Sequence, residues 1–249
     1  MILVISDIHG NADALHAIIE DAHRNYDIQQ YALLGDMFTL GPSPLEVYET
    51  ISKLSNSFFI RGNHEDYLTS KIHEQNSPKI GNFNSGTELY KRIQTSIERT
   101  YLALGENRVA NLQSICIEEF KLNIAGINHY FCHGTPDTNT IGVWNNEVAK
   151  QLEFINDGCM WAGHIHHQLL TISGNKKFIN PGGSGLPFDG DHRAPYAVID
   201  AFGMPQLHRV SYSYENVIRK LGECSEDLFA PILQKHLEYA KLVKHPTFG

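Results

Sequence analysis

The sequence predicts an α/β fold, a two-sheet β-sandwich flanked by helices. Through the first 60 residues, short apolar runs alternate with helical patterns, which is typical of a parallel sheet with helices on its faces. After residue 115, β-rich stretches follow one another with glycine and proline between them. These stretches predict a second sheet.

The first strand and helix are expected directly at the start of the chain. Residues 2–6 form a continuous apolar run, the pattern of a strand buried on both faces. Asn11 is a candidate N-cap for a helix in which Leu15, Ile18, Ile19 and Ala22 share one face.

The same pattern then returns once along the chain. Residues 31–34 predict a strand, 44–54 a helix and 58–60 a further strand. The alternation places these strands next to the first one in a parallel sheet.

A polar segment interrupts this pattern at about residues 71–105. It contains a predicted helix with Leu89, Ile93, Ile97 and Tyr101 on one face. We expect a helical insertion here, and two roles stay open for it: a lid over the site that precedes it, or a dimer contact.

The remaining elements are expected in the second half. Residues 115–132, 161–174 and 178–200 predict strands of the second sheet. Pro231 suits the first turn of a C-terminal helix that carries Leu233, Leu237 and Ala240 on one face. Because nothing marks a linker, we expect a single domain over residues 1–249.

Composition narrows the classes of function. The 28 acidic and 20 basic residues give a formal charge of −8, which argues against binding to the nucleic-acid backbone or to anionic lipid. The four cysteines lie far apart, without a C-x-x-C pair, so neither a zinc ribbon nor a disulfide framework is indicated. With no signal-peptide pattern and no apolar stretch of about 20 residues, we expect a cytoplasmic protein without a membrane partner. Homo-oligomer formation stays open.

Five polar motifs follow predicted strands, each with glycine or in a turn. On an extended chain the two ends of the first motif point to the same side, and the last motif repeats that geometry. The carboxyl ends of strands are the usual place for ligand crevices in open α/β sheets. The motifs are Asp7-Ile8-His9, Gly35-Asp36, Gly62-Asn63-His64-Glu65, His133-Gly134 and Gly163-His164-Ile165-His166.

The side chains of these motifs offer oxygen and nitrogen donors and no thiolate. Imidazole with carboxylate suits a catalytic Mn, Fe or Zn site better than a closed structural zinc site. The sequence therefore predicts a catalytic metal centre.

The ordered series D-x-H, G-D, G-N-H-E, H-G and G-H-x-H resembles the calcineurin-like metallophosphoesterase superfamily. The later stretches Asn180–Gly185 and Asp189–Arg193 resemble its small prokaryotic branch of phosphodiesterases and phosphatases. The resemblance implies a four-layer αββα fold and a hydrolase acting on phosphoester bonds. This branch usually has Asp where the chain has Glu65, and proline where it has His192.

The resemblance also implies two bound divalent metal ions and a set of ligands for each. Mn²⁺ is favoured, and Fe, Zn, Co and Ni are compatible with the donors. One ion would be held by Asp7, His9 and His166, the second by Asn63, His133 and His164, with Asp36 bridging them and His64 left as the catalytic histidine.

The chemistry of the donors agrees with this assignment. A carboxylate has two acceptor oxygens, so Asp36 can join two cations. Two divalent ions against Asp7 and Asp36 leave a net positive site, which attracts phosphate and lowers the pKa of bound water to about 7. Attack of a metal-bridging hydroxide on phosphorus follows, and His64 can protonate the leaving oxygen.

Two further residues are candidates for binding the substrate. Asn11 is favoured as a helix N-cap, and contact with phosphate is its second role. Arg193 can either clamp a phosphate or pair with Asp189 or Asp191, and the sequence does not separate these.

The predicted function is hydrolysis of a small phosphoester: a phosphodiester, a phosphomonoester or a nucleotide such as diadenosine polyphosphate. Two alternatives stay open. The protein can be a protein phosphatase, or a non-catalytic metal-binding scaffold of the same fold.

Overall fold

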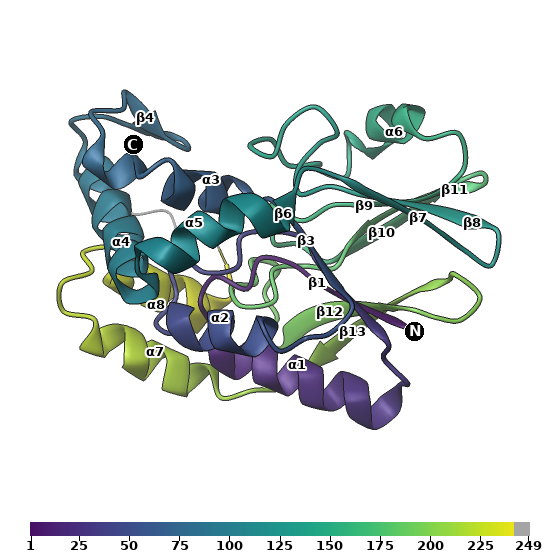
Figure 1. Ribbon diagram of the computed structural model, residues 1–249, viewed down its shortest axis with the longest axis horizontal. Coiled ribbons are helices and arrows are strands. Elements are labelled where there is room, and N and C mark those ends of the chain that lie inside the picture. The colour runs from purple at the N-terminus through teal and green to yellow at the C-terminus, as the bar shows by residue number, and fades with distance from the viewer. Residues whose placement is uncertain (242–249) are drawn as a thin grey trace.

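A computed structural model describes residues 1–241 and contains two mixed β-sheets packed face to face (Figure 1). The first sheet has the strand order β13-β12-β1-β2-β3-β6. Its strands are β1 (Ile2–Ile5), β2 (Gln30–Leu33), β3 (Ser57–Ile60), β6 (Cys116–Ile117), β12 (Ala194–Ile199) and β13 (Pro205–Val210).

The second sheet has the order β10-β11-β9-β8-β7. Its strands are β7 (Phe120–Ile124), β8 (Ile127–Phe131), β9 (Gly158–Trp161), β10 (Leu169–Ser173) and β11 (Lys176–Asn180). A third, two-stranded sheet pairs β4 (Lys79–Ile80) with β5 (Phe83–Asn84).

Helices cover the outer face of the first sheet, and short helices lie against the second (Figure 1). The helices are α1 (Ala12–Asn25), α2 (Pro44–Ile51), α3 (Asn63–Thr69), α4 (Glu88–Leu104), α5 (Glu106–Ile115), α6 (Val148–Gln151), α7 (Tyr214–Glu223) and α8 (Ala230–Tyr239), with the 3-10 turns η1 (Ile72–Glu74) and η2 (Leu152–Phe154). Among residues 1–241, none of these helices is long and apolar enough to cross a membrane.

The alternation of side chains along each strand makes the layers. In β1, Leu3 and Ile5 pack toward the helices, whereas Val4 packs between the two sheets. In β9, Trp161 is buried between the sheets and Met160 packs toward α6 and η2. Because every strand residue of β1 and β9 is buried, both faces of these central strands are covered.

The prediction of two sheets with flanking helices is confirmed, but the assignment of two strands was wrong. Residues 116–117 were expected in the second sheet, and they form β6, which pairs parallel with β3 in the first sheet. Residues 194–199 were expected in the second sheet, and they form β12, which pairs antiparallel with β1 in the first sheet. The first sheet is therefore mixed, with parallel β1, β2, β3 and β6 and antiparallel β12 and β13. Local patterning does not report which sheet a strand joins, because that depends on pairing with residues almost 200 positions away.

Segment 71–105 contains the β4–β5 hairpin as well as the expected helix. The apolar face of α4 is buried as its spacing predicts. The C-terminal helix α8 has proline in its first turn as expected, although Ala240 caps the helix with a left-handed backbone and does not continue it. The single-domain organisation and the insertion stay predictions.

Candidate metal centre

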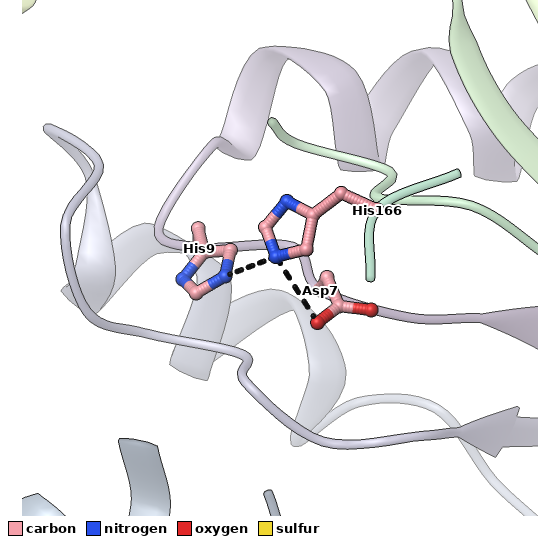
Figure 2. Close-up of side chains that lie close together, drawn as sticks. All are labelled: Asp7, His9 and His166. Atoms are coloured by element: carbon pink, nitrogen blue, oxygen red, sulfur yellow. Dashed lines mark hydrogen bonds and ion pairs between the residues drawn. The ribbon is translucent and has the colours of Figure 1, made fainter. Parts of the chain in front are cut away.

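Two groups of candidate ligands lie together at the carboxyl ends of the strands. Asp7, His9 and His166 form the first group (Figure 2), and Asp36, His133 and His164 form the second. Within each group, one ligand atom from each residue lies within 4.8 Å of the others.

In the first group, three side chains from distant parts of the sequence point toward one another, as Figure 2 shows. The Nε2 atoms of His9 and His166 are 3.1 Å apart, and Nε2 of His166 lies 3.4 Å from Oδ1 of Asp7. The opposite ring nitrogens face backbone carbonyls: Nδ1 of His166 lies 2.6 Å from the oxygen of Leu186, and Nδ1 of His9 lies 3.3 Å from that of Thr39.

This arrangement fits a metal ion. A ring whose Nδ1–H donates to a carbonyl has a lone pair on Nε2. Two such lone pairs facing each other beside a carboxylate repel unless a cation lies between them. The donors of the first group therefore fit a divalent ion.

The second group extends to Asn63. Nδ1 of His164 lies 3.0 Å from Oδ1 of Asn63 and 3.3 Å from Nε2 of His133. Nδ1 of His133 lies 2.5 Å from the carbonyl oxygen of Leu34, which leaves its Nε2 for a ligand role.

Asp36 lies between the two groups. Its Oδ2 is 3.4 Å from Nε2 of His133 and 3.9 Å from Nε2 of His9, and its Oδ1 accepts a hydrogen bond from the backbone N–H of His64. One carboxylate oxygen thus faces a nitrogen of each group, which fits the bridging position.

The protonation states suit ligands. Burial alone would raise the pKa of Asp7, but the neighbouring His166 and His133 outweigh it and lower the pKa to about 2. Burial lowers the pKa of His9 to about 3 and that of His164 to about 4, so both rings are neutral. Burial also opposes the charged form of His133. The facing Asp36 outweighs burial and raises the pKa of His133 to about 10, so this ring is protonated at neutral pH and has to lose a proton to bind a metal ion.

The backbone at the ligands is strained, and the expectation of an extended D-x-H segment was wrong. Asp7 and His9 have φ of 52° and 46°, and Asp36, His164 and His166 also have positive φ, between 54° and 69°. The left-handed region is costly for residues with a Cβ and occurs mostly where surrounding contacts enforce it. The ligands converge because tight turns aim them, not because neighbours alternate along a strand.

Hydrogen bonds between the loops hold these turns. The N–H of Asp7 donates to the carbonyl of Gly35, and the N–H of His9 donates to that of Asp36. Glu65 is buried and accepts hydrogen bonds from the N–H groups of Asp36, Met37 and Gly62. The glutamate at this position therefore braces the loop that presents Asp36.

His64 lies beside the two groups and belongs to neither. Its Nε2 is 4.0 Å from Oδ2 of Asp36, and its Nδ1 is 2.5 Å from the hydroxyl of Thr39. Its ring meets the rings of His9 and Tyr67 edge-on. The side chain is 13% exposed and lines a cavity, so it is accessible to a bound molecule.

Asn11 is engaged inside the fold. It is 1% exposed, its Oδ1 caps α1 by accepting the N–H of Ala14, and its Nδ2 donates to Gly185 and Tyr212. All its polar atoms have partners inside the fold, so the structure shows the favoured N-cap role, and contact with phosphate stays a prediction.

Arg193 pairs with Asp191 and does not line the cavity. Its guanidinium donates to both carboxylate oxygens of Asp191 on the surface. The structure therefore shows the pairing alternative, and phosphate binding by Arg193 stays a prediction. Asp189 pairs instead with Arg209, which the sequence did not single out.

Several residues beside the site were missed in the sequence. Leu186 orients His166 through its carbonyl, and the ring of Phe188 stacks on His166 with centroids 4.4 Å apart. Tyr67 lies three residues after His64 on α3; helical spacing identifies it only once residues 63–69 are known to form a helix, where a turn was expected.

The chain is similar to one protein family and to individual known proteins. The sequence model of the calcineurin-like phosphoesterase family matches residues 1–168. An uncharacterized protein of Methanocaldococcus jannaschii is 27% identical over 239 residues, which cover 89% of this chain and 91% of that protein. A symmetrical bis(5'-nucleosyl)-tetraphosphatase of Baumannia cicadellinicola is 42% identical over 65 residues, 26% of this chain and 23% of that protein.

Two solved structures share the fold over almost their whole length. A metallophosphoesterase from Sphaerobacter thermophilus superposes with a TM-score of 0.73 at 23% identity, covering 96% of this chain and 98% of that one. A hypothetical protein from Pyrococcus horikoshii superposes with a TM-score of 0.80 at 20% identity, covering 98% and 100%.

Proposed function

This chain belongs to the calcineurin-like phosphoesterase family, hydrolases acting on phosphoester bonds, and from that premise we propose that it hydrolyses a small phosphoester with the help of two divalent metal ions. The observation that carries the proposal is the position of Asp36, one oxygen of which faces a ligand nitrogen of each of the two groups. A structural metal site needs neither a second ion nor a free histidine beside it.

The bound ions would supply positive charge that attracts the phosphoryl group and acidifies water. Asp7, His9 and His166 would hold one ion, Asn63, His133 and His164 the other, and Asp36 would contact both. Since the donors are oxygen and nitrogen, Mn²⁺ is the first ion to test.

His64 would supply the proton that the leaving group needs. Hydrolysis adds the oxygen of water to phosphorus and breaks the P–O bond to the alcohol, whose oxygen takes up a proton as it leaves. If the hydroxyl of Thr39 donates to Nδ1, the proton of His64 is on Nε2, which is the ring nitrogen on the side of Asp36.

The cavity beside the site supports a small substrate. Its volume is about 680 Å³, within the range of pockets that bind small molecules. The bis(5'-nucleosyl)-tetraphosphatase that matches 65 residues of this chain makes a dinucleoside polyphosphate one candidate substrate. The acidic net charge supports the inference that polynucleotides and anionic membranes are not partners.

The test is hydrolysis of p-nitrophenyl phosphate and bis-p-nitrophenyl phosphate by purified protein, chelated and then restored with Mn²⁺ or other divalent ions. We expect activity to need the metal and to fall by about 10²-fold or more in His64→Ala. His16→Ala, which removes an exposed histidine on α1, is the matched control and keeps the activity. Inactivity with every metal, despite two ions bound per chain, would favour the scaffold alternative.

Isotope labelling tests the direct displacement. In ¹⁸O-labelled water the label should enter the released phosphate, which locates the cleavage at the P–O bond. A substrate with a chiral phosphorus atom should react with inversion, as a single displacement by water requires. A trapped phosphoenzyme would contradict the proposal.

A further inference from the structure

The cavity beside the metal centre has two different kinds of wall. Part of its lining consists of site residues, among them His9, His64 and His166. Another part consists of apolar side chains of the β4–β5 hairpin, α4 and the C-terminal segment: Ile80, Phe83, Ile93, Phe229 and Leu233. We call these five side chains the apolar wall.

The apolar wall comes mostly from parts of the chain that carry no ligand. Phe229 and Leu233 lie after residue 168, where the match to the family ends, and Ile80 and Phe83 belong to the small third sheet. The ring of Phe83 meets that of Phe229 with centroids 6.3 Å apart, so hairpin and C-terminal segment touch across the cavity edge.

Hydrogen bonds join α4 to the C-terminal segment, and the contact between Phe83 and Phe229 adds the hairpin. Arg99 of α4 donates to the buried carboxylate of Asp227 at 2.8 Å and to the carbonyl oxygens of Leu40 and Gly41. Arg92 donates to the carbonyl of Leu228. The apolar wall is therefore pre-formed, which lowers the entropic cost of binding.

The charge of the lining is low. Among the described residues that line the cavity, Lys79 is the single lysine or arginine, and none is an aspartate or glutamate. A dinucleoside tetraphosphate brings four phosphate groups, which proteins bind with arginine and lysine. Beyond the metal centre, the lining offers such a chain one cation and offers apolar contact to a carbon skeleton.

We propose that the site selects phosphoesters that contain a single phosphorus atom and an apolar, aromatic alcohol portion, and that the apolar wall binds this portion. The inference rests on the proposed function, because it assigns the phosphoryl group to the metal centre. The alcohol portion then lies between the β4–β5 hairpin and α8.

The experiment measures binding separately from turnover. Methylphosphonate, benzylphosphonate and 1-naphthylmethylphosphonate carry a C–P bond that the reaction does not break, so their binding to Mn²⁺-loaded protein is measured by calorimetry and by competition with p-nitrophenyl phosphate. Since the added rings bury apolar surface, we expect the naphthyl compound to bind at least about tenfold more tightly than methylphosphonate. Diadenosine tetraphosphate should bind more weakly than the naphthyl compound.

Two variants locate the preference. Phe83→Ala should lose most of the tenfold preference, whereas the matched Phe202→Ala, which truncates a phenylalanine that is 75% exposed and outside the cavity, should keep it. Phe83 is only partly buried, so Phe83→Leu, which removes the ring and keeps an apolar side chain in the hairpin, tests the same preference if Phe83→Ala does not fold.

The outcomes separate this inference from the proposed function. Equal binding of the three phosphonates, or tighter binding of diadenosine tetraphosphate, would overturn the inference even if hydrolysis occurs. Graded binding without any hydrolysis would support the inference on the selective pocket and overturn the proposed catalytic function.

Discussion

At the scale of single residues, the site depends on side chains that never meet the substrate. Glu65 binds no metal in the proposed assignment, yet it accepts hydrogen bonds from three backbone N–H groups around Asp36. A buried N–H group without a partner costs roughly 1–3 kcal/mol. Glu65 therefore contributes both to the stability of the fold and to the placement of the Asp36 carboxylate.

Truncation of Glu65 tests this role. Glu65→Ala should lower the free energy of unfolding by about 2–4 kcal/mol and reduce metal occupancy, because three donors lose their acceptor. Glu65→Gln should lie between, since one amide oxygen can still accept from Asp36 and Gly62. Urea unfolding and metal analysis measure both effects, with the exposed Glu49→Ala as the control expected within about 0.5 kcal/mol of the parent. An alanine variant with full metal content would exclude the bracing role.

His129, which lies outside the metal centre, should make the stability of the protein depend on pH. It is buried, it accepts a hydrogen bond from Nε1–H of Trp161, and burial lowers its pKa from 6.5 to about 4. As the pH falls below 6.5, the unfolded chain takes up a proton that folded His129 does not, so stability should decrease between pH 6.5 and 4. Urea unfolding of chelated protein at pH 7 and pH 5 should show a smaller loss in His129→Gln than in the parent. Equal losses would show that another group controls this range.

At the scale of elements, tight loops and not the strands themselves place the ligands. Five ligands adopt a left-handed backbone, and glycine lets neighbouring loops approach them. A Cβ on Gly62 would lie 2.1 Å from Oδ1 of Asp36, and one on Gly163 would lie 2.0 Å from Oγ of Ser6. These contacts are too short for any side chain, so the glycines of the motifs serve packing.

Substitution of Gly62 tests the close approach. Gly62→Ala should displace Asp36 or the start of α3, lowering both the free energy of unfolding and metal affinity. Gly222→Ala in the last turn of α7 should change stability by less than about 1 kcal/mol and leave metal affinity unchanged, because alanine favours a helix and would meet only the end of Gln234, which donates to the carbonyl of Ile218. Thermal unfolding and metal titration compare the pair, and unchanged metal affinity in Gly62→Ala would contradict the argument.

At the scale of the whole molecule, the C-terminal segment closes the site that the first two thirds of the chain build. Asp227 has a fully buried carboxylate paired with Arg99, which also binds the carbonyls of Leu40 and Gly41 near His9. Removing one partner of a buried pair leaves an unpaired charge. The pair thus couples the last helices to the loop beside the metal centre.

This coupling predicts unequal effects of two similar truncations. Asp227→Ala should destabilise the protein by about 3 kcal/mol or more, since Arg99 loses its partner in the interior. Glu223→Ala removes an exposed partner of Arg219 and should cost less than about 1 kcal/mol. Urea unfolding measures both, and similar small losses would show that the buried pair does not hold the segment.

The sequence by itself determined the donors, their order and the family. Asp7, His9, Asp36 and the later histidines follow apolar strands, and their types are readable without a structure. Buried strands and amphipathic helices were also predictable, because their patterns depend on residues at most a few positions apart.

Only the tertiary structure decided which polar side chains remain available and what closes the cavity. The sequence allows two roles each for Asn11 and Arg193, and only the structure shows their partners, which are Gly185 and Tyr212 for Asn11 and Asp191 for Arg193. The same holds for β12, which crosses to the first sheet, and for the apolar wall from the hairpin and α8. These features depend on contacts between residues far apart in the chain, and no local pattern reports such contacts.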